Sequence, residues 1–384
     1  MYRRSFLLAI LGTISCVAHA ADADGWVNLF NGKDLSNWVN VNCAPDTWKV
    51  EDGVIKCTGK PTGALRTPKM YENFVMEVEW RHMTSGGNAG IFIWSSPIAA
   101  TGVPFLRAVE VQVLDHGYGN TDSHTTHGDV FPIHGSTMNP IGRSRGSRSF
   151  PSEHRSKPSP EWNHYHIEAR DGSLRLSVNG KEVSGGDKCN WRKGYIGLES
   201  EGAPTEWRMV RVKELPSSNA PAAESAPEAQ GHRPLYNGLD LRGWKTTTPD
   251  RWKPSDWQLQ LTPGTPGTPL WSEAEFGDAE IIFDIKVNKK PEKEPAVLLR
   301  KPGGEPFRLP LSTLVPTDDA SQGFKLGQWH RVILTLKGGA VTTTINDKQV
   351  SQQDLPVAAG TQRNLGIEDT GADLTFANFY IRNL

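Results

Sequence analysis

The chain has 384 residues with a formal net charge of -1, and 37% of its residues are hydrophobic and 22% charged. This is an ordinary globular composition, and the length is sufficient for two domains. The balanced charge gives no electrostatic case for binding nucleic acid or an anionic membrane surface, because either needs a basic excess gathered on one face. Small neutral partners fit this composition better.

The first twenty residues differ from the rest of the chain. A positively charged head precedes an apolar run that begins at Phe6, and an A-x-A pattern ends at Ala20. This order predicts a secretory signal peptide over residues 1–20 and a periplasmic or secreted protein. The apolar run is too short to span a bilayer, and no other stretch looks transmembrane. Cys16 raises a lipoprotein alternative, which Thr13 disfavours because a leucine is expected at that position.

Removal of the predicted signal peptide leaves Cys43, Cys57 and Cys189. An odd number of cysteines in an exported chain allows at most one disulfide within the chain, so the cysteines do not form a disulfide scaffold. Buried, inert thiols are the alternative for each of them.

The chain contains the same domain pattern twice. "LFNGKDLSNW" from Leu29 recurs as "LYNGLDLRGW" from Leu235, and "EWNHYHIEARDGSLRLSVNGKEV" aligns without a gap with "QWHRVILTLKGGAVTTTINDKQV". Between the copies lies a stretch rich in Pro, Ala and Ser that lacks the residues of a core. We therefore predict a tandem duplication, with a first domain over residues 21–215, a linker over 216–234 and a shorter second domain over 235–384.

Polar and apolar residues alternate within each copy. "FVMEVEWR" places Glu77, Glu79 and Arg81 on one face, and "AVEVQVLD" places Glu110 and Gln112 on one face. Short alternating runs broken by Gly, Asn and Asp favour antiparallel sandwiches. We expect an all-β protein made of two tandem jelly-roll β-sandwich domains joined by the Pro/Ala-rich linker.

A long loop in the first copy has no counterpart in the second. Eight of the eleven histidines fall between His82 and His166, and "LDHGYGNTDSHTTHGDVFPIHGS" lies in this region. A long polar loop on a rigid sheet is a common way to build a site. The alternative is a solvated loop in which residues such as Asp115 only cap turns.

Three chemistries suit this loop. A divalent metal ion is one, because histidine nitrogens and a carboxylate are suitable donors, although the spacing matches no strong zinc signature. The second is general acid–base chemistry by a histidine with a nearby carboxylate. The third is binding of sugar hydroxyls, with Trp94, Trp162 or Tyr118 as an aromatic platform, although such residues more often belong to a core. The metal candidates are His124, His127, Asp129 and His134.

Seven ordered motifs between Trp26 and Leu215 resemble the 3-keto-disaccharide hydrolase domain family. They are "LFNGKDLSNW", "WKVEDGVIKCTG", "NFVMEVEWR", "GNAGIFIW", "VEVQVLD", "EWNHYHIEARDGSLRLSVNGKEV" and "GYIGLESEGAPTEWRMVRVKEL". The second half resembles the family only through its opening and closing motifs. The resemblance implies a concanavalin-like jelly roll and an exported enzyme that cleaves glycosides oxidised to a ketone at sugar carbon 3.

The implied chemistry explains why acids and bases are wanted. A ketone at carbon 3 acidifies the hydrogen on carbon 2, so a base can remove it and the oxygen on carbon 1 leaves by β-elimination. Addition of water then completes a net hydrolysis. The site needs a base, a group that stabilises the enolate oxygen and an acid for the leaving group. No nicotinamide is required, and "TSGGNAG" is a turn rather than a dinucleotide fingerprint.

We expect the site on the polar face of a concave sheet in the first domain, under the histidine-rich loop. His116 or His127 is the expected base, and Arg81 is expected to hold the oxygen that becomes negative. The catalytic candidates are Arg81, Glu110, Asp115, His116 and His127. The substrate-binding candidates are Gln112, Trp94, Tyr118, His164, His166 and Glu199. An ordinary wet face for Glu77, Glu79 and Arg81 is the alternative, because parity does not show which face is concave.

Two other functions fit the same sequence. A non-catalytic carbohydrate-binding module is one, because fold does not fix function. A conventional glycosidase that uses two carboxylates, such as Glu110 and Glu199, is the other. The expected partner is in each case a carbohydrate. The second domain is expected to be an accessory sandwich.

Overall fold

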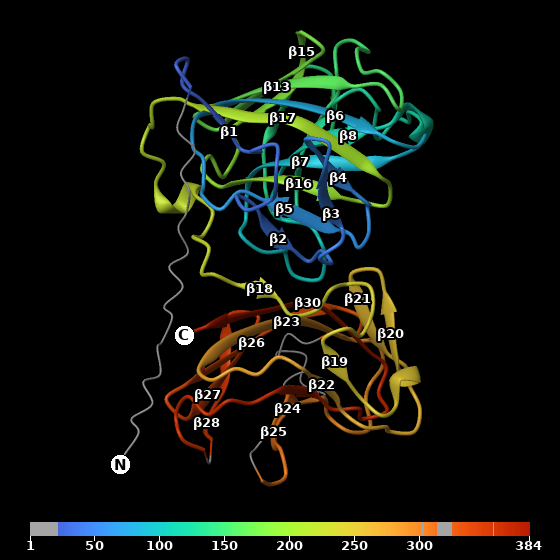
Figure 1. Cartoon of the computed structure of the whole chain (residues 1–384), viewed down its shortest axis with the longest axis vertical. Coiled ribbons are helices and arrows are strands. Elements are labelled where there is room, and N and C mark those ends of the chain that lie inside the picture. The colour runs from blue at the N-terminus through green and yellow to red at the C-terminus, as the bar shows by residue number, and fades with distance from the viewer. Residues whose placement is uncertain (1–21, 301–302, 313–324, 356) are drawn as a thin grey trace, which may run out of the picture.

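The computed structural model describes residues 22–300, 303–312, 325–355 and 357–384. The predicted signal peptide over residues 1–20, with Cys16, lies outside these ranges. The expected fold class is confirmed: the protein consists of two β-sandwich domains in tandem, and Figure 1 shows one sandwich above the other. The described residues contain no helix long and apolar enough to cross a membrane.

The first domain packs a nine-stranded sheet on an eight-stranded sheet. The larger sheet has the order β10-β15-β14-β13-β6-β17-β4-β3 with β1 paired to β17, and the smaller has the order β11-β12-β9-β8-β7-β16-β5-β2. The larger sheet contains β1 (Trp26–Asn28), β3 (Trp48–Glu51), β4 (Val54–Cys57), β6 (Phe74–His82), β10 (Asn139–Ile141), β13 (Asn163–Arg170), β14 (Ser173–Val178), β15 (Lys181–Asp187) and β17 (Thr205–Glu214). The smaller contains β2 (Val39–Val41), β5 (Gly63–Arg66), β7 (Asn88–Ser95), β8 (Ala108–Leu114), β9 (Val130–Ile133), β11 (Ser144–Arg145), β12 (Arg148–Ser149) and β16 (Tyr195–Ser200).

The second domain repeats this plan, with fewer strands among its described residues. Its larger sheet has the order β20-β21-β30-β23-β26-β27-β28 with β18 paired to β30, and its smaller sheet has the order β19-β22-β29-β24-β25. The larger sheet contains β18 (Arg233–Pro234), β20 (Trp252–Ser255), β21 (Gln258–Leu261), β23 (Ala279–Val287), β26 (Trp329–Lys337), β27 (Ala340–Ile345), β28 (Lys348–Asp354) and β30 (Leu374–Asn383). The smaller contains β19 (Trp244–Lys245), β22 (Leu270–Ser272), β24 (Ala296–Leu299), β25 (Phe307–Pro310) and β29 (Leu365–Ile367). Short 3-10 helices are η1 (His116–Tyr118), η2 (Ala222–Glu224) and η3 (Pro249–Arg251).

The alternation of polar and apolar residues decides which side chains face the core of the first domain. On β6, Met76, Val78 and Trp80 are buried between the sheets. On β8, Val111 and Val113 fill the same core from the opposite sheet. The residues between them on each strand therefore face outward, from one sheet or from the other.

The second domain packs on the outer face of the eight-stranded sheet. The loop over residues 96–103 makes polar contacts across this interface: Gly102 N donates to Asp284 Oδ2 at 2.8 Å, and Arg331 donates to the Ala99 carbonyl at 2.9 Å. Apolar side chains of both domains fill the rest of the interface. They are Val41, Ala64, Phe92, Ala99, Leu106 and Ala108 from the first domain and Ile282 and Tyr380 from the second.

The linker follows the surface of the first domain rather than leaving it. Ala226 N donates to the Lys193 carbonyl at 2.8 Å, and Ala229 N donates to the Tyr195 hydroxyl at 2.7 Å. These bonds hold the chain between the domains against β16.

All three described cysteines are free and buried. Burial raises the pKa of Cys57 to about 11, and burial raises that of Cys189 to about 12. The inert-thiol alternative for Cys43, Cys57 and Cys189 is therefore the one that the structure shows.

Candidate active site

A cavity of 430 Å³ opens on the outer face of the eight-stranded sheet, beside the part that the second domain covers. Its floor comes from β7, β8, β9, β12 and β16, and its rim comes from the histidine-rich loop. We call it the carboxylate cavity, because three glutamates line it. The lining residues are Asn88, Phe105, Glu110, Gln112, Leu114, Tyr118, Ser123, His124, Phe131, Ile133, His134, Arg148, Glu199 and Glu201.

Two carboxyl groups meet above a glycine in the centre of this floor. A side chain at Gly90 would place its Cβ 2.8 Å from Glu110 Oε1 and 2.9 Å from Glu199 Oε2. Any other residue at this position of β7 would therefore displace both carboxyl groups from their present places. The missing side chain leaves the space above the strand to the two acids.

Burial changes the acidity of this pair. Burial, with the nearby charge of Glu201, raises the pKa of Glu110 to about 8. Burial and the charge of Glu110 raise the pKa of Glu199 well above its usual range. Glu199 Oε2 is buried and has no hydrogen-bond partner. Such an atom is costly to bury unless a ligand completes its bonding, so this acid is poised to meet a substrate.

A chain of amides holds the third glutamate. Asn88 Nδ2 donates to Glu201 Oε2 at 2.5 Å, and Gln112 Nε2 donates to Asn88 Oδ1 at 2.9 Å. Burial also raises the pKa of Glu201, against the bond that it accepts from Asn88. Glu199, with its pKa well above the usual range, is therefore the candidate acid of the cluster.

One cation faces these acids from β12. Arg148 donates to Asp129 Oδ2 at 2.9 Å, and its guanidinium lies 3.4 Å from the centroid of the Phe131 ring. Its charge opposes the rise in the pKa of Glu110. Asp129 is fully buried and also accepts bonds from Thr125. The buried aspartate thus fixes the arginine at the edge of the cavity.

The histidine-rich loop divides into two groups. Tyr118 and His124 line the cavity, and their rings meet edge to face with centroids 5.5 Å apart. His116 and His127 are absent from the lining; both contact the Ser156 hydroxyl, at 2.9 and 2.8 Å. The second pair braces the loop, whereas the first faces the ligand space.

Asp115 also braces the loop. Asp115 accepts bonds from the backbone N–H groups of Gly86, Gly117 and Ser159, at 2.7 to 2.9 Å. These bonds, against the opposing effect of burial, lower its pKa. Asp115 therefore joins three segments of backbone and is not available as a catalytic group.

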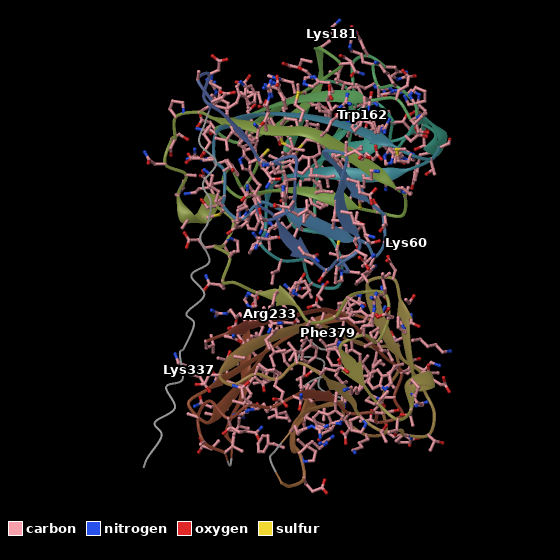
Figure 2. All side chains as sticks on the ribbon, viewed as in Figure 1. Lys60, Trp162, Lys181, Arg233, Lys337 and Phe379 are labelled. Atoms are coloured by element: carbon pink, nitrogen blue, oxygen red, sulfur yellow. The ribbon has the colours of Figure 1, made fainter. Side chains whose placement is uncertain are left out.

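Four expected site residues lie elsewhere. Arg81 belongs to β6 of the nine-stranded sheet, where it donates to Glu206 at 2.6 Å and stacks on Trp162, which Figure 2 shows in the half of the first domain away from the second. His164 and His166 are on the neighbouring strand β13. Trp94 is buried in the core, and its Nε1 donates to the Glu72 carbonyl. The wet-face alternative holds for Arg81, because β6 and β8 belong to opposite sheets.

The metal candidates do not converge. His124 contacts Thr121, His127 contacts Ser156, Asp129 is paired with Arg148, and His134 stacks on Phe105. Within the described ranges no group of three or more His, Cys, Asp or Glu side chains is arranged to hold a metal ion. The four donors do not fit a metal centre.

Eight lining residues were not expected from the sequence, and three of them, Asn88, Arg148 and Glu201, carry the amide and charged groups. Asn88 lies two residues from Gly90, and Glu201 lies two residues from Glu199, so the alternation of side chains along the strands predicts that both face the cavity. Arg148 comes from a two-residue strand in the long loop, and no periodic pattern marks it.

The second domain has lost the acid pair. In the first domain, Gly197 pairs with Phe92 of β7, which pairs with Glu110 of β8. In the second domain, Gly366, which aligns with Gly197, pairs with Leu298 of β24, which pairs with Arg308 of β25. Arg308 thus occupies the position of Glu110.

The residue of the second domain that corresponds to Glu199 is held in ion pairs. Glu368, which aligns with Glu199, accepts bonds from Arg308 Nε at 2.9 Å and from Lys293 at 2.7 Å. Both partners of Glu368 are therefore cations. The second copy therefore retains the scaffold without the acid–base pair.

Comparison with known proteins gives matches over both domains. The model of the 3-keto-alpha-glucoside-1,2-lyase-like domain matches residues 25–213 and again residues 231–382. A curated protein of Bacteroides thetaiotaomicron, a 3-keto-disaccharide hydrolase, is 24% identical over 250 residues that cover 50% of this chain and 80% of the relative.

Two similar solved structures each cover about half of the chain. A putative glycosyl hydrolase of Parabacteroides distasonis is 21% identical, with a TM-score of 0.39, over 50% of this chain and 95% of the other. A carbohydrate binding module of Bacillus subtilis is 13% identical, with a TM-score of 0.33, over 46% of this chain and 96% of the other.

Proposed function

Because the chain belongs to the 3-keto-alpha-glucoside-1,2-lyase-like domain family, we propose that its first domain cleaves 3-keto glycosides by β-elimination in the carboxylate cavity. The observation that carries the proposal is the buried pair Glu110 and Glu199, which meets over Gly90 with both pKa values raised. Neighbouring carboxyl groups whose pKa values are strongly shifted by their surroundings are typical of acid–base catalysis.

Glu110 is the proposed base. A carboxylate with a pKa of about 8 is a far stronger base than an ordinary one, and it removes the hydrogen on carbon 2 next to the ketone. The electron pair of that C–H bond forms the carbon 1–carbon 2 double bond as the bond from carbon 1 to the glycosidic oxygen breaks. The proton remains on Glu110.

Glu199 is the proposed acid. Burial and the charges of Glu110 and Glu201 raise its pKa well above the usual range, which favours the protonated form, and its Oε2 has no hydrogen-bond partner in the protein. It gives this proton to the departing oxygen, so the products are the unsaturated 3-keto sugar and an alcohol. Later addition of water across the double bond makes the overall change a hydrolysis.

Arg148 supplies the positive charge. During removal of the carbon 2 hydrogen the ketone oxygen becomes negative, and a guanidinium held by a buried carboxylate stabilises it without moving. Gln112, Tyr118 and His124 line the cavity and suit the hydroxyl groups of the ring. As part of the same proposal, the protein acts outside the cytoplasm after removal of residues 1–20.

The test compares substrates and matched variants. The full chain is incubated with a 3-keto glucoside and with its unoxidised parent, and release of the alcohol is followed. We expect release from the keto sugar alone, a fall of at least about 100-fold for Glu199→Gln, and no change for Glu368→Gln in the second domain.

Other outcomes decide against elimination. Equal release from the parent sugar identifies a conventional two-carboxylate glycosidase. No release from either, together with sugar binding, identifies a binding module. Equal loss in Glu368→Gln, with an unchanged unfolding temperature, places the chemistry outside the carboxylate cavity.

A further inference from the structure

A second cavity, of 650 Å³, lies between the two domains and adjoins the carboxylate cavity. His134 lines both cavities, and its ring stacks on Phe105 with centroids 5.6 Å apart. The two spaces therefore meet at one imidazole. We call the second space the interdomain cavity. If the ketone ring of a glycoside lies over Gly90, the other half of the molecule extends past His134 into this cavity.

Three parts of the chain build the interdomain cavity. The loop over residues 96–101 gives one wall, the linker from Pro227 to His232 gives another, and Arg331 of β26 gives the third. These walls are fixed, because His232 contacts Glu280 at 2.9 Å and Arg331 is paired with Asp284 at 2.8 Å. Either domain alone would lack this cavity, which has a volume typical of small-ligand sites.

Two arginines line the interdomain cavity, and among the described residues Arg331 is paired with Asp284 whereas Arg107 has no carboxylate partner. The Nε of Arg107 is buried without a hydrogen-bond partner. Its guanidinium lies 3.6 Å from the centroid of the Trp191 ring, so the indole orients it. Burial lowers the pKa of Arg107, which shows that the protein surroundings disfavour its charge. An incoming anion would offset that cost.

The chemistry of a planar arginine selects the anion. A guanidinium stacked on an aromatic ring offers two parallel N–H donors to a carboxylate, and an ammonium group cannot reproduce this geometry. Glu228 also lines the cavity and disfavours ligands with several negative charges. A single carboxylate, as in a uronic acid, fits this balance.

We propose that the interdomain cavity is the leaving-group subsite and that Arg107 binds a carboxylate on the leaving group, so that acidic disaccharides with a uronosyl leaving group are preferred substrates. The position of the cleaved bond rests on the proposed function, whereas the recognition of the carboxylate does not.

The test measures binding of free glucuronate and free glucose to the full chain by calorimetry, so it needs no turnover. We expect glucuronate to bind more tightly than glucose, and Arg107→Gln to weaken glucuronate by at least about tenfold without affecting glucose. Arg107→Lys keeps the charge but loses the paired donors, so it should weaken glucuronate less than Arg107→Gln. Arg143→Gln, at an exposed arginine over Phe150, is the matched control and should change nothing.

Two results would overturn the proposal. One is equal affinity for glucose and glucuronate in the unaltered chain. The other is glucuronate binding that neither Arg107→Gln nor Arg107→Lys weakens; the lysine variant decides the case if the glutamine variant fails to fold. Failure of the elimination chemistry gives a different result. In that case neither the unaltered chain nor Glu110→Gln cleaves a 3-keto glycoside, but both still bind glucuronate with equal affinity.

Discussion

The position of Glu110 in the fold explains its place in the cavity. It belongs to a strand whose alternate residues form the core, and the same alternation directs its carboxyl group into the cavity. The sequence alone was sufficient to place Glu110 and Gln112 on one face. It was not sufficient to exclude Arg81, because alternation shows that a side chain points outward but not from which of two sheets.

The raised pKa of Glu110 has a consequence for stability. Between its ordinary pKa of 4.5 and its folded value of about 8, the folded chain keeps a proton that the unfolded chain has lost. The stabilisation from this proton is complete below the lower value and is lost as the pH rises through the upper one. Glu110→Gln removes the titration, so we expect its unfolding temperature to fall less than that of the unaltered chain between pH 5 and pH 9. Parallel curves for the two proteins would show that Glu110 titrates normally.

At the scale of elements, the sequence was sufficient to locate the histidine-rich loop but not to show which of its side chains line the cavity. Composition marked the segment as functional, yet its side chains separate into a group that lines the cavity and a group around Ser156. Contacts such as the stacking of His127 on His154, with centroids 3.9 Å apart, join residues whose spacing has no period. Local sequence carries no signal for them.

The bracing group makes the loop sensitive to acid. Burial, with the charges of His154 and His116, lowers the pKa of His127 to about 4. Below its ordinary value of 6.5 the unfolded chain takes up a proton that folded His127 refuses, so stability is lost as the pH falls from 6.5 towards 4. We expect His127→Gln to make the fall in unfolding temperature on acidification shallower than in the unaltered chain. An equally steep fall in the His127 variant would assign the acid sensitivity to other groups.

At the scale of the whole molecule, duplication has produced one domain with an acid pair and one with an ion pair. The repeat was visible in the sequence, because scaffold residues at turns and strand ends are shared. The exchange of Glu110 for Arg308 was not visible, since it appears only when strand registers are compared. The second domain nevertheless borders the substrate space, because Arg331 completes the interdomain cavity.

The most informative single measurement is the rate of alcohol release from a 3-keto glucoside that carries deuterium on carbon 2, compared with the same substrate carrying hydrogen. Elimination breaks that bond, so release from the deuterated sugar should be slower, and Glu110→Gln should abolish release from both. Equal rates with full activity would mean that the carbon 2 hydrogen is not removed in a rate-limiting step, and release by Glu110→Gln at the unaltered rate would show that Glu110 is not the base.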